Sequence, residues 1–207
     1  MKPLRTLAFT AAFIATGAVA QGFTPPAASL AGTPSGTYTL DKTHANIIFG
    51  INHLGFSTYY GRFDNFDATL TFDAKDPTKS SLNVTIDTAS TNTNNKVLED
   101  KLDSKVFFNT AQFPKATFVS KKLEKTSDTT GKLTGDLTLL GVTKPVTLDV
   151  TFNASGLNPF SKSHTLGFGA TGMIKRSDFG MKEYLPAVGD EVVLQIQAEF
   201  AQAPAKN

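Results

Sequence analysis

The feature that most constrains the fold is an alternation of apolar and polar residues with a period of two. It is clearest over 66–72, where Phe-Asp-Ala-Thr-Leu-Thr-Phe places every second residue in an apolar series. Because successive side chains of a strand point to opposite faces of a sheet, each such stretch predicts a strand with one buried face. The eight predicted strands cover residues 45–51, 66–72, 82–86, 115–124, 133–139, 146–152, 166–170 and 192–200.

Turn-forming residues separate these strands and leave little room for helix. The Asn-Pro pair at 158–159 and the Val-Gly-Asp stretch at 188–190 both suit chain reversals. Only residues 94–103 have a helical period, with Asn94 or Asn95 as the N-cap. Closure of so large an antiparallel sheet removes its exposed edges. We therefore predict an all-β fold, an eight-stranded antiparallel barrel with a short helical insertion near 94–103, and a two-sheet sandwich as the alternative.

The N-terminus has the layout of a secretory signal peptide. Lys2 and Arg5 precede a largely apolar run over 6–17, and the small residues Ala18 and Ala20 form a cleavage site. We expect cleavage after Ala20 and export of the mature protein. The expected division of the chain is a signal peptide over 1–20, a flexible leader over 21–36, a barrel domain over 37–201 and a C-terminal tail over 202–207.

Composition argues against several classes of function. The chain contains no Cys, so disulfides and thiolate nucleophiles are unavailable. Of 20 basic residues two lie in the signal peptide, which leaves 18 against 18 acidic residues, without the positive bias of nucleic-acid binders. No G-x-S-x-G elbow or H-E-x-x-H motif occurs. We therefore expect no catalytic residues, no metal site and no nucleic-acid partner.

One stretch, Gly167-Phe-Gly-Ala-Thr-Gly172, matches the dinucleotide-binding pattern G-x-G-x-x-G. A nucleotide site needs these glycines between a strand and the N-terminus of a helix, whose free N–H groups hold the pyrophosphate. Here the glycines lie inside the alternation of a predicted strand, and no helical period follows. We interpret them as strand glycines.

Several short motifs stand in a fixed order along the chain. They are Tyr38-Thr-Leu-Asp41, Thr43-His44, Asn52-His-Leu-Gly-Phe-Ser57, Gly61-Arg-Phe63, Phe113-Pro114, Leu139-Leu-Gly-Val-Thr-Lys-Pro145, Arg176-Ser-Asp-Phe-Gly180 and Val188-Gly-Asp-Glu-Val192. In this order, over about residues 37–201, the sequence resembles the YceI-like family of bacterial periplasmic proteins. The resemblance implies a lipocalin-like barrel around a long apolar pocket that holds polyisoprenoid-type or other long-chain lipids.

Bulky apolar residues on the inward strand faces are the candidate ligand contacts. Seventeen Phe and no Trp give large apolar surfaces without an indole N–H that needs a partner. An eight-stranded barrel is either filled by side chains or holds one small ligand. The candidate apolar contacts are Ile47, Phe49, Ile51, Phe66, Leu70, Leu148, Val150, Phe168, Ala170, Leu194 and Ile196.

Small residues also occur on the same inward faces of the strands as these bulky residues. They are Ala45, Ala68, Gly135, Ala170, Gly172 and Ala198. They either leave a channel for a lipid chain or let other side chains interdigitate in a dry core. The residues alone leave both readings open, and the family resemblance favours the channel.

Two histidines are candidates for chemistry near neutral pH. His44 and His53 are nine residues apart, so an unbroken strand would place them on opposite faces, which argues against shared metal coordination. His53 continues the inward series of residues 45–51. It either hydrogen-bonds the head of a lipid or is satisfied by a backbone carbonyl at the barrel end.

Only two arginines, Arg62 and Arg176, follow the signal peptide. Arginine forms directed, paired hydrogen bonds that lysine does not reproduce, so each is expected to have a fixed partner. The partner is either an acid, such as Asp64 or Asp178, or a phosphate or quinone oxygen at the mouth of the pocket. Both arginines are therefore candidate ligand contacts.

The expected function is binding without catalysis. We expect a periplasmic protein that holds an isoprenoid lipid, of polyprenyl phosphate or quinone type, for transport, storage or sequestration, with no covalent cofactor. One alternative is an accessory module that presents a quinone-like ligand to a membrane redox partner, and a less favoured one is a lipid-modifying enzyme. A homodimer and a transient membrane-protein partner are both compatible with the sequence.

Overall fold

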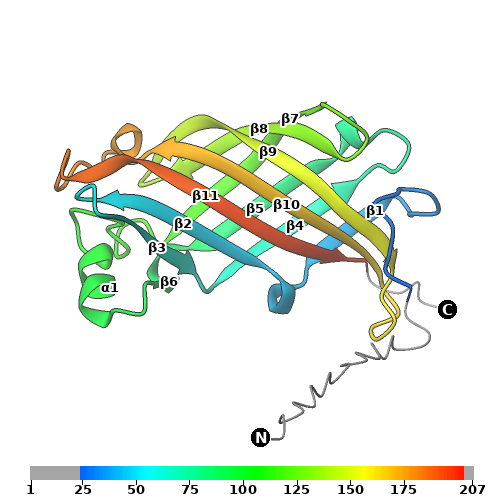
Figure 1. Ribbon diagram of the computed structural model, residues 1–207, viewed down its shortest axis with the longest axis horizontal. Helices are drawn as coiled ribbons and strands as arrows, with labels where there is room; N and C mark the ends of the chain where they lie inside the picture. Colours follow the sequence, from blue (N-terminus) through cyan, green and yellow to red (C-terminus); the bar gives the residue numbers. More distant parts are fainter. Residues whose placement is uncertain (1–23, 203–207) are drawn as a thin grey trace, which may run out of the picture.

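The computed structural model describes residues 24–202, whose strands form an elongated barrel (Figure 1). The predicted signal peptide lies outside the described residues. In chain order the elements are β1 (Gly36–Leu40), the 3₁₀ helix η1 (Lys42–His44), β2 (Asn46–His53), β3 (Ser57–Phe63), β4 (Phe66–Phe72), η2 (Pro77–Lys79), β5 (Ser81–Asp87), η3 (Thr88–Ser90), β6 (Thr91–Asn92), α1 (Lys96–Asp103), β7 (Lys115–Lys125), β8 (Thr130–Leu139), β9 (Val142–Leu157), β10 (His164–Lys175), η4 (Arg176–Phe179) and β11 (Val188–Ala201).

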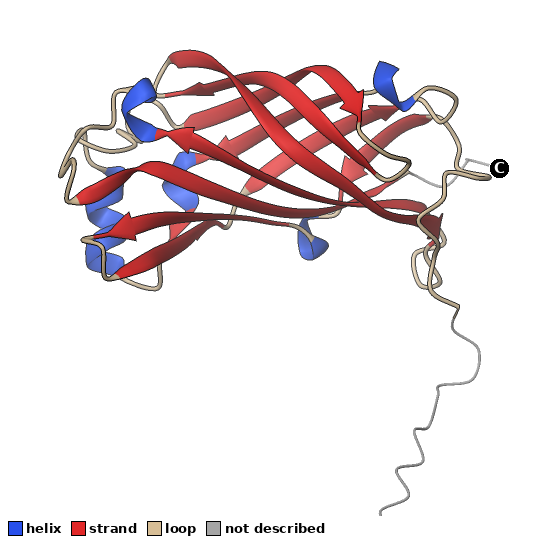
Figure 2. Cartoon of the chain, turned by 45° about the horizontal axis from the view of Figure 1, so that its top comes forward, coloured by secondary structure: helices blue, strands red, loops and turns tan. Residues whose placement is uncertain are grey.

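Eight antiparallel strands close into a ring in the order β1-β4-β5-β7-β8-β9-β10-β11. The ring closes where β11 pairs with β1, through Thr39 opposite Ala201 and Leu40 opposite Phe200. The predicted eight-stranded antiparallel barrel is confirmed. Figure 2 shows the strands forming a continuous wall.

Three further strands extend the wall beside β11, where β2 pairs with β11, β3 with β2, and β6 with β3. Sequence periodicity missed β1, β3 and β6. In β3, Tyr59, Gly61 and Phe63 lie on one face of the strand, and the glycine interrupts the apolar series on that face. β1 and β6 have only five and two residues, too short to establish a period.

The turn predictions have mixed outcomes. Asn158 lies at the β9–β10 turn as expected, where its carbonyl accepts a hydrogen bond from the Lys162 N–H. The predicted reversal at 188–190 is wrong, because these residues begin β11. Their turn-like composition instead coincides with a shift in register between Val188 and Val192 against β2. A bulge of this kind accommodates glycine in a continuous strand.

The glycine-rich stretch 167–172 lies wholly inside β10. Its residues pair with β11 on one side and β9 on the other, and no helix begins there. Its interpretation as strand glycines is confirmed.

The predicted helical insertion is α1, capped by Asn95, whose side chain accepts a hydrogen bond from the Leu98 N–H. The helix lies at one end of the barrel beside β3 and β6 (Figure 1). We call this the α1 end. No helix of the described chain is long and apolar enough to cross a membrane.

Buried apolar residues form two clusters inside the barrel. One includes the fully buried Tyr38 and Leu166, and the other includes Phe108 and Phe179 near the α1 end. Burial of each such side chain contributes roughly 1.5–3 kcal/mol. The residues packed against both clusters, Phe63, Val84, Ile86 and Ile196, are only partly buried. All four line the interior cavity described below.

Residues of the predicted leader that the structure describes lie against β9. The Ser155 N–H donates to the Ala27 carbonyl over 3.1 Å, and the Ser155 hydroxyl donates to the Ser29 carbonyl over 2.6 Å. The Thr33 and Ser155 hydroxyls are 2.7 Å apart. These contacts lie at the end of the barrel opposite α1.

Candidate ligand-binding site

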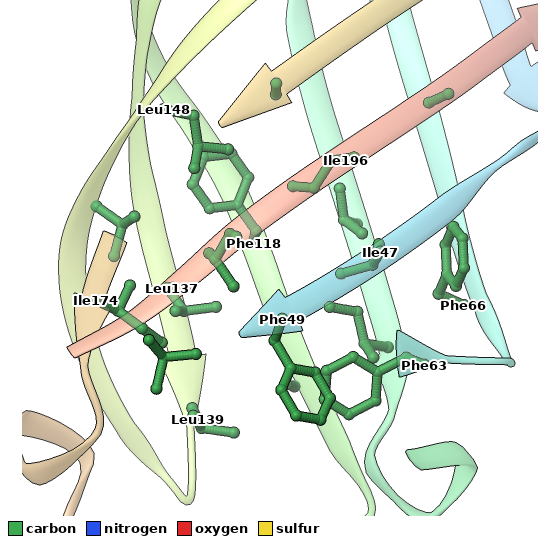
Figure 3. A pocket seen from close by; sticks show the side chains of 18 of the residues that line it. Ile47, Phe49, Phe63, Phe66, Phe118, Leu137, Leu139, Leu148, Ile174 and Ile196 are labelled. Carbon is green, nitrogen blue, oxygen red and sulfur yellow. The ribbon is translucent and has the colours of Figure 1, made fainter. Parts of the chain in front are cut away.

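A cavity of about 790 Å³ occupies the interior of the barrel. Figure 3 shows side chains from facing strands directed into this common space, among them Phe49 from β2, Phe118 from β7 and Leu148 from β9. All eight strands of the closed ring contribute to its wall. The volume falls in the range of about 300–1,000 Å³ typical of small-molecule pockets.

All eleven apolar residues proposed as ligand contacts lie in the wall of this cavity. They are Ile47, Phe49, Ile51, Phe66, Leu70, Leu148, Val150, Phe168, Ala170, Leu194 and Ile196. His53 and Arg176 also line it, whereas Arg62 does not. The alternation of the strands therefore brings together apolar residues from five strands, β2, β4, β9, β10 and β11. Their contact with a ligand stays a prediction.

Sequence reasoning missed the part of the wall that irregular segments supply. Phe107 and Phe108 follow α1, and Met181 follows η4. These residues lie outside regular strands, so no period marks them as inward. Leu98 and Leu102 of α1 also line the cavity, and their spacing of four residues was the available signal.

The small inward residues divide between the two readings that the sequence left open. Ala68, Ala170 and Ala198 line the cavity, where their short side chains leave space. Gly135 is instead covered by the Phe118 ring, and a Cβ at Gly172 would lie 2.5 Å from Leu148 Cδ2. The alanines thus widen the cavity, and these two glycines let bulky neighbours pack against the wall.

Most polar side chains of the cavity wall lie at the α1 end, while Ser80, Ser81 and Ser120 line it near η2. The rings of His53 and Tyr59 lie 6.3 Å apart, and the Tyr59 hydroxyl donates to the Thr93 carbonyl over 3.3 Å. The Lys101 ammonium lies 4.3 Å from the centroid of the Tyr184 ring and donates to its hydroxyl. These groups form a polar opening to an apolar lumen.

Arg176 is buried beside this opening and is held by backbone carbonyls. Its Nε donates to the Gly189 carbonyl over 2.8 Å, and its Nη1 and Nη2 donate to the carbonyls of Met181 and Val188, each over 3.0 Å. Burial lowers the pKa of Arg176 from its ordinary value, which the nearby charge of Asp190 partly offsets. The guanidinium keeps its charge at neutral pH.

The partner expected for Arg176 is therefore corrected. No carboxylate of the described chain forms an ion pair with it, and Asp178 is not its partner. The nearby Asp190 instead accepts hydrogen bonds from the Ser177 N–H and hydroxyl, over 2.8 and 2.7 Å. Three backbone carbonyls, one after η4 and two at the start of β11, bind the guanidinium instead, a pattern that the linear sequence does not reveal.

Arg62 lies away from the cavity, on the opposite face of its strand from Gly61 and Phe63. Its Nε is 2.7 Å from the Asp64 carboxylate, and both side chains are about half exposed. Of the two partners considered for Arg62, an acid and a ligand oxygen, the structure shows the acid.

One cluster of potential metal ligands, Asp41, His44 and Glu199, lies outside the barrel wall. The sequence places His44 close to Asp41 and Thr43, which predicts a structural role for His44, but it does not bring Glu199 to this group. Asp41 caps η1 through the Thr43 N–H over 3.0 Å, and its other oxygen is 2.9 Å from His44 Nδ1. Hydrogen bonds from Thr43 and His44 lower the pKa of Asp41 to about 2, and Asp41 raises the pKa of His44. These hydrogen bonds stabilise η1, so Asp41 and His44 have a structural role without a metal ion.

The closed antiparallel ring and its interior apolar cavity define the class of protein, a lipocalin-like barrel. The YceI-like domain model matches residues 38–200. This match spans most of the chain, and the chain belongs to the YceI-like family.

Known relatives agree with this assignment. Protein YceI of Escherichia coli O157:H7 is 45% identical over 167 residues, which cover 80% of this chain and 86% of that protein. The crystal structure of the Campylobacter jejuni YCEI protein has a TM-score of 0.68 and 33% identity, and covers 74% of this chain and 91% of that one. A polyisoprenoid binding domain from Saccharophagus degradans has a TM-score of 0.60 at 16% identity, and covers 80% and 98%. At that identity the likeness concerns the fold alone.

Proposed function

We propose that this protein binds a long-chain isoprenoid or similar lipid, with the chain in the barrel lumen and the head group at the α1 end. The observation that carries the proposal is the cavity of about 790 Å³, lined by apolar side chains from every strand of the closed ring. Between the polar groups at the α1 end and the serines near η2, the wall is lined by aliphatic and aromatic side chains, so it suits a ligand that is apolar along most of its length.

The affinity would come mainly from the buried chain. Each methylene that leaves water contributes about 0.8 kcal/mol. An unfilled apolar cavity also forfeits the dispersion contacts that its lining side chains could make. A ligand that fills the lumen therefore gains from both effects.

The groups at the α1 end favour a head with oxygen acceptors. His53, Lys101 and Arg176 line the cavity there, and their imidazole, ammonium and guanidinium groups can all donate hydrogen bonds. A phosphate or a quinone oxygen would accept hydrogen bonds from such donors. The ligand class is therefore polyprenyl phosphate or quinone.

Family membership and fold support the same proposal. The Saccharophagus degradans domain, which shares this fold, is described as polyisoprenoid binding. The N-terminal sequence supports export to the periplasm, where the protein would carry, store or sequester its lipid. Among the described residues the cavity wall contains no Asp, Glu or Cys. Such a wall offers no carboxylate or thiol nucleophile.

The proposal is tested by titrating delipidated protein with prenyl phosphates of increasing chain length. Affinity should rise with each isoprene unit until the lumen is full and then level off. The matching prenols, which lack the phosphate, should show the same length dependence with weaker binding. An affinity independent of chain length would contradict binding inside the lumen.

A further inference from the structure

Exposed apolar side chains surround the opening of the cavity at the α1 end. Their exposed fractions are 50% for Leu54, 88% for Phe56, 81% for Val97 and 47% for Tyr184. Single exposed apolar residues are normal on soluble proteins. These four, however, come from three separate segments, the β2–β3 turn, α1 and the loop before β11, which converge at one end of the barrel (Figure 1).

Direct contacts hold the three segments together. The Leu54 N–H donates to the Ala187 carbonyl over 3.0 Å, which ties the β2–β3 turn to the loop before β11. Lys101 contacts Tyr184 and so ties α1 to that loop. Val97 precedes Lys101 by four residues and lies on the same face of the helix. We call Leu54, Phe56, Val97 and Tyr184 the apolar rim.

The apolar rim is continuous with the lumen. Leu54 and Tyr184 both line the cavity while about half of each side chain is exposed. An apolar surface therefore runs from the interior, past the opening, to the outside of the barrel. Leu54 and Tyr184 differ in this respect from exposed apolar residues elsewhere, such as Phe160 and Met173, which do not line the cavity.

The β2–β3 turn holds the rim in a defined position. Leu54 has φ 57° and Gly55 has φ 76°, and the left-handed region is unfavourable for a bulky residue such as leucine. Two hydrogen bonds fix the turn, from the Gly55 N–H to the Asn52 side chain over 2.9 Å and from the Phe56 N–H to the His53 carbonyl over 3.0 Å. The turn thus displays Phe56 to solvent next to His53.

We propose that the apolar rim is a membrane-contact surface, which seats the opening of the cavity on a lipid bilayer. Aromatic and aliphatic side chains with a nearby cation suit the interface, where rings lie at head-group level and the cation meets phosphates. Phe56 and Val97 enter the bilayer surface, and Lys101 lies at the level of the head groups. A lipid chain then passes between bilayer and lumen along Leu54 and Tyr184 without crossing water. This inference rests on the proposed lipid-binding function.

The experiment uses the absence of tryptophan from the chain. Phe56→Trp places a single fluorophore on the rim. Phe160→Trp is the matched control, because Phe160 is 93% exposed in the β9–β10 turn at the opposite end. Each variant is mixed with vesicles of phosphatidylethanolamine and phosphatidylglycerol, with and without brominated acyl chains.

The expected result is a shift of the Phe56→Trp emission to shorter wavelength on addition of vesicles, and quenching by the brominated chains. The Phe160→Trp emission should not change. Unchanged emission from both variants, or a response of Phe160→Trp alone, would overturn the proposal. A short-wavelength emission of Phe56→Trp that grows with protein concentration without vesicles would also overturn it, by showing that a second copy covers the rim.

A transfer assay separates this inference from the proposed function. Phe56→Ser with Val97→Ser should slow lipid uptake from vesicles several-fold, while affinity for a soluble short-chain prenyl phosphate stays unchanged. Neither residue lines the cavity. Uptake at the wild-type rate by this variant would overturn the membrane-contact role and leave lipid binding intact. Failure of both proteins to bind any prenyl phosphate would instead contradict the proposed function.

Discussion

The ring of Phe49 lies directly over Gly61 of the neighbouring strand, with which it pairs across β2 and β3. A Cβ added at Gly61 would overlap the Phe49 ring. The ring centroid is also 5.5 Å from that of Phe63. The absence of a side chain at Gly61 therefore lets the Phe49 ring lie against the wall of the cavity that it lines.

Gly61→Ala should push the Phe49 ring into the lumen and narrow the cavity. We expect a loss of stability of about 1–3 kcal/mol, the usual effect of overpacking, and weaker binding of branched prenyl chains than of straight alkyl chains. Gly167→Ala is the control, because its added Cβ would meet no atom closer than 3.7 Å. Denaturant unfolding and lipid titration measure the two effects. Equal behaviour of the two variants would contradict the role given to Gly61.

The two described arginines should differ sharply in their effect on stability. Arg176→Lys cannot reproduce three forked bonds to carbonyls, so it should cost about 2 kcal/mol or more. Arg62→Lys changes an exposed ion pair worth at most about 1 kcal/mol. Urea unfolding of both variants gives the comparison. A smaller loss for Arg176→Lys than for Arg62→Lys would show that the buried bonds are not what holds the loop.

Two substitutions of His53 distinguish a role in binding the lipid head group from a purely structural role. One hydrogen bond to a ligand oxygen is worth roughly 0.5–1.5 kcal/mol, so His53→Leu should weaken binding of a prenyl phosphate several-fold. His53→Gln keeps a polar tip and should weaken it less, and neither change should affect a ligand without a head group. A sharp and equal fall in Tm for both variants, at unchanged affinity, would mark His53 as structural.

The interaction between Asp41 and His44 should make the stability of the folded protein depend on pH. The hydrogen bond to Asp41 raises the pKa of His44 above 6.5, and the pKa of Asp41 falls to about 2. The contribution of His44 to stability is therefore complete below its unfolded pKa and is lost as pH rises through its folded pKa. The contribution of Asp41 is present above 3.8 and is lost as pH falls towards 2.

An NMR titration of the His44 imidazole checks this pair directly. Asp41→Asn should lower the pKa of His44 towards 6.5, since it removes the charge that stabilises the imidazolium. The same pKa in both proteins would mean that Asp41 does not hold the protonated ring.

Strand periodicity was sufficient to predict the barrel and its apolar wall. Leu148 and Phe168 belong to clean alternations, so their inward orientation follows from the geometry of a strand. β3 escaped prediction because Gly61 replaces an apolar residue in its inward series. That replacement is required by the neighbouring Phe49, which only the pairing of the two strands reveals.

The polar part of the site depends on contacts between residues that are far apart in the sequence, and the sequence pattern does not predict these contacts. The sequence predicts a fixed partner for Arg176, but the three carbonyls that bind it belong to Met181, which follows η4, and to Val188 and Gly189 at the irregular start of β11. Lys101 and Tyr184, 83 residues apart, meet only because α1 folds across the barrel end. Sequence reasoning therefore predicted the lumen well and its opening poorly.

The most direct test of the account is mass spectrometry of the intact protein purified from its native host without detergent. The wild type should carry a long-chain lipid, released on denaturation and identified by extraction. Thr171→Trp, on the exposed face of β10, should carry the same lipid, whereas Ala170→Trp, which fills the lumen, should remain folded and carry none. A wild type that is free of lipid and takes up no prenyl phosphate, or equal lipid content in all three proteins, would contradict lipid binding in the lumen.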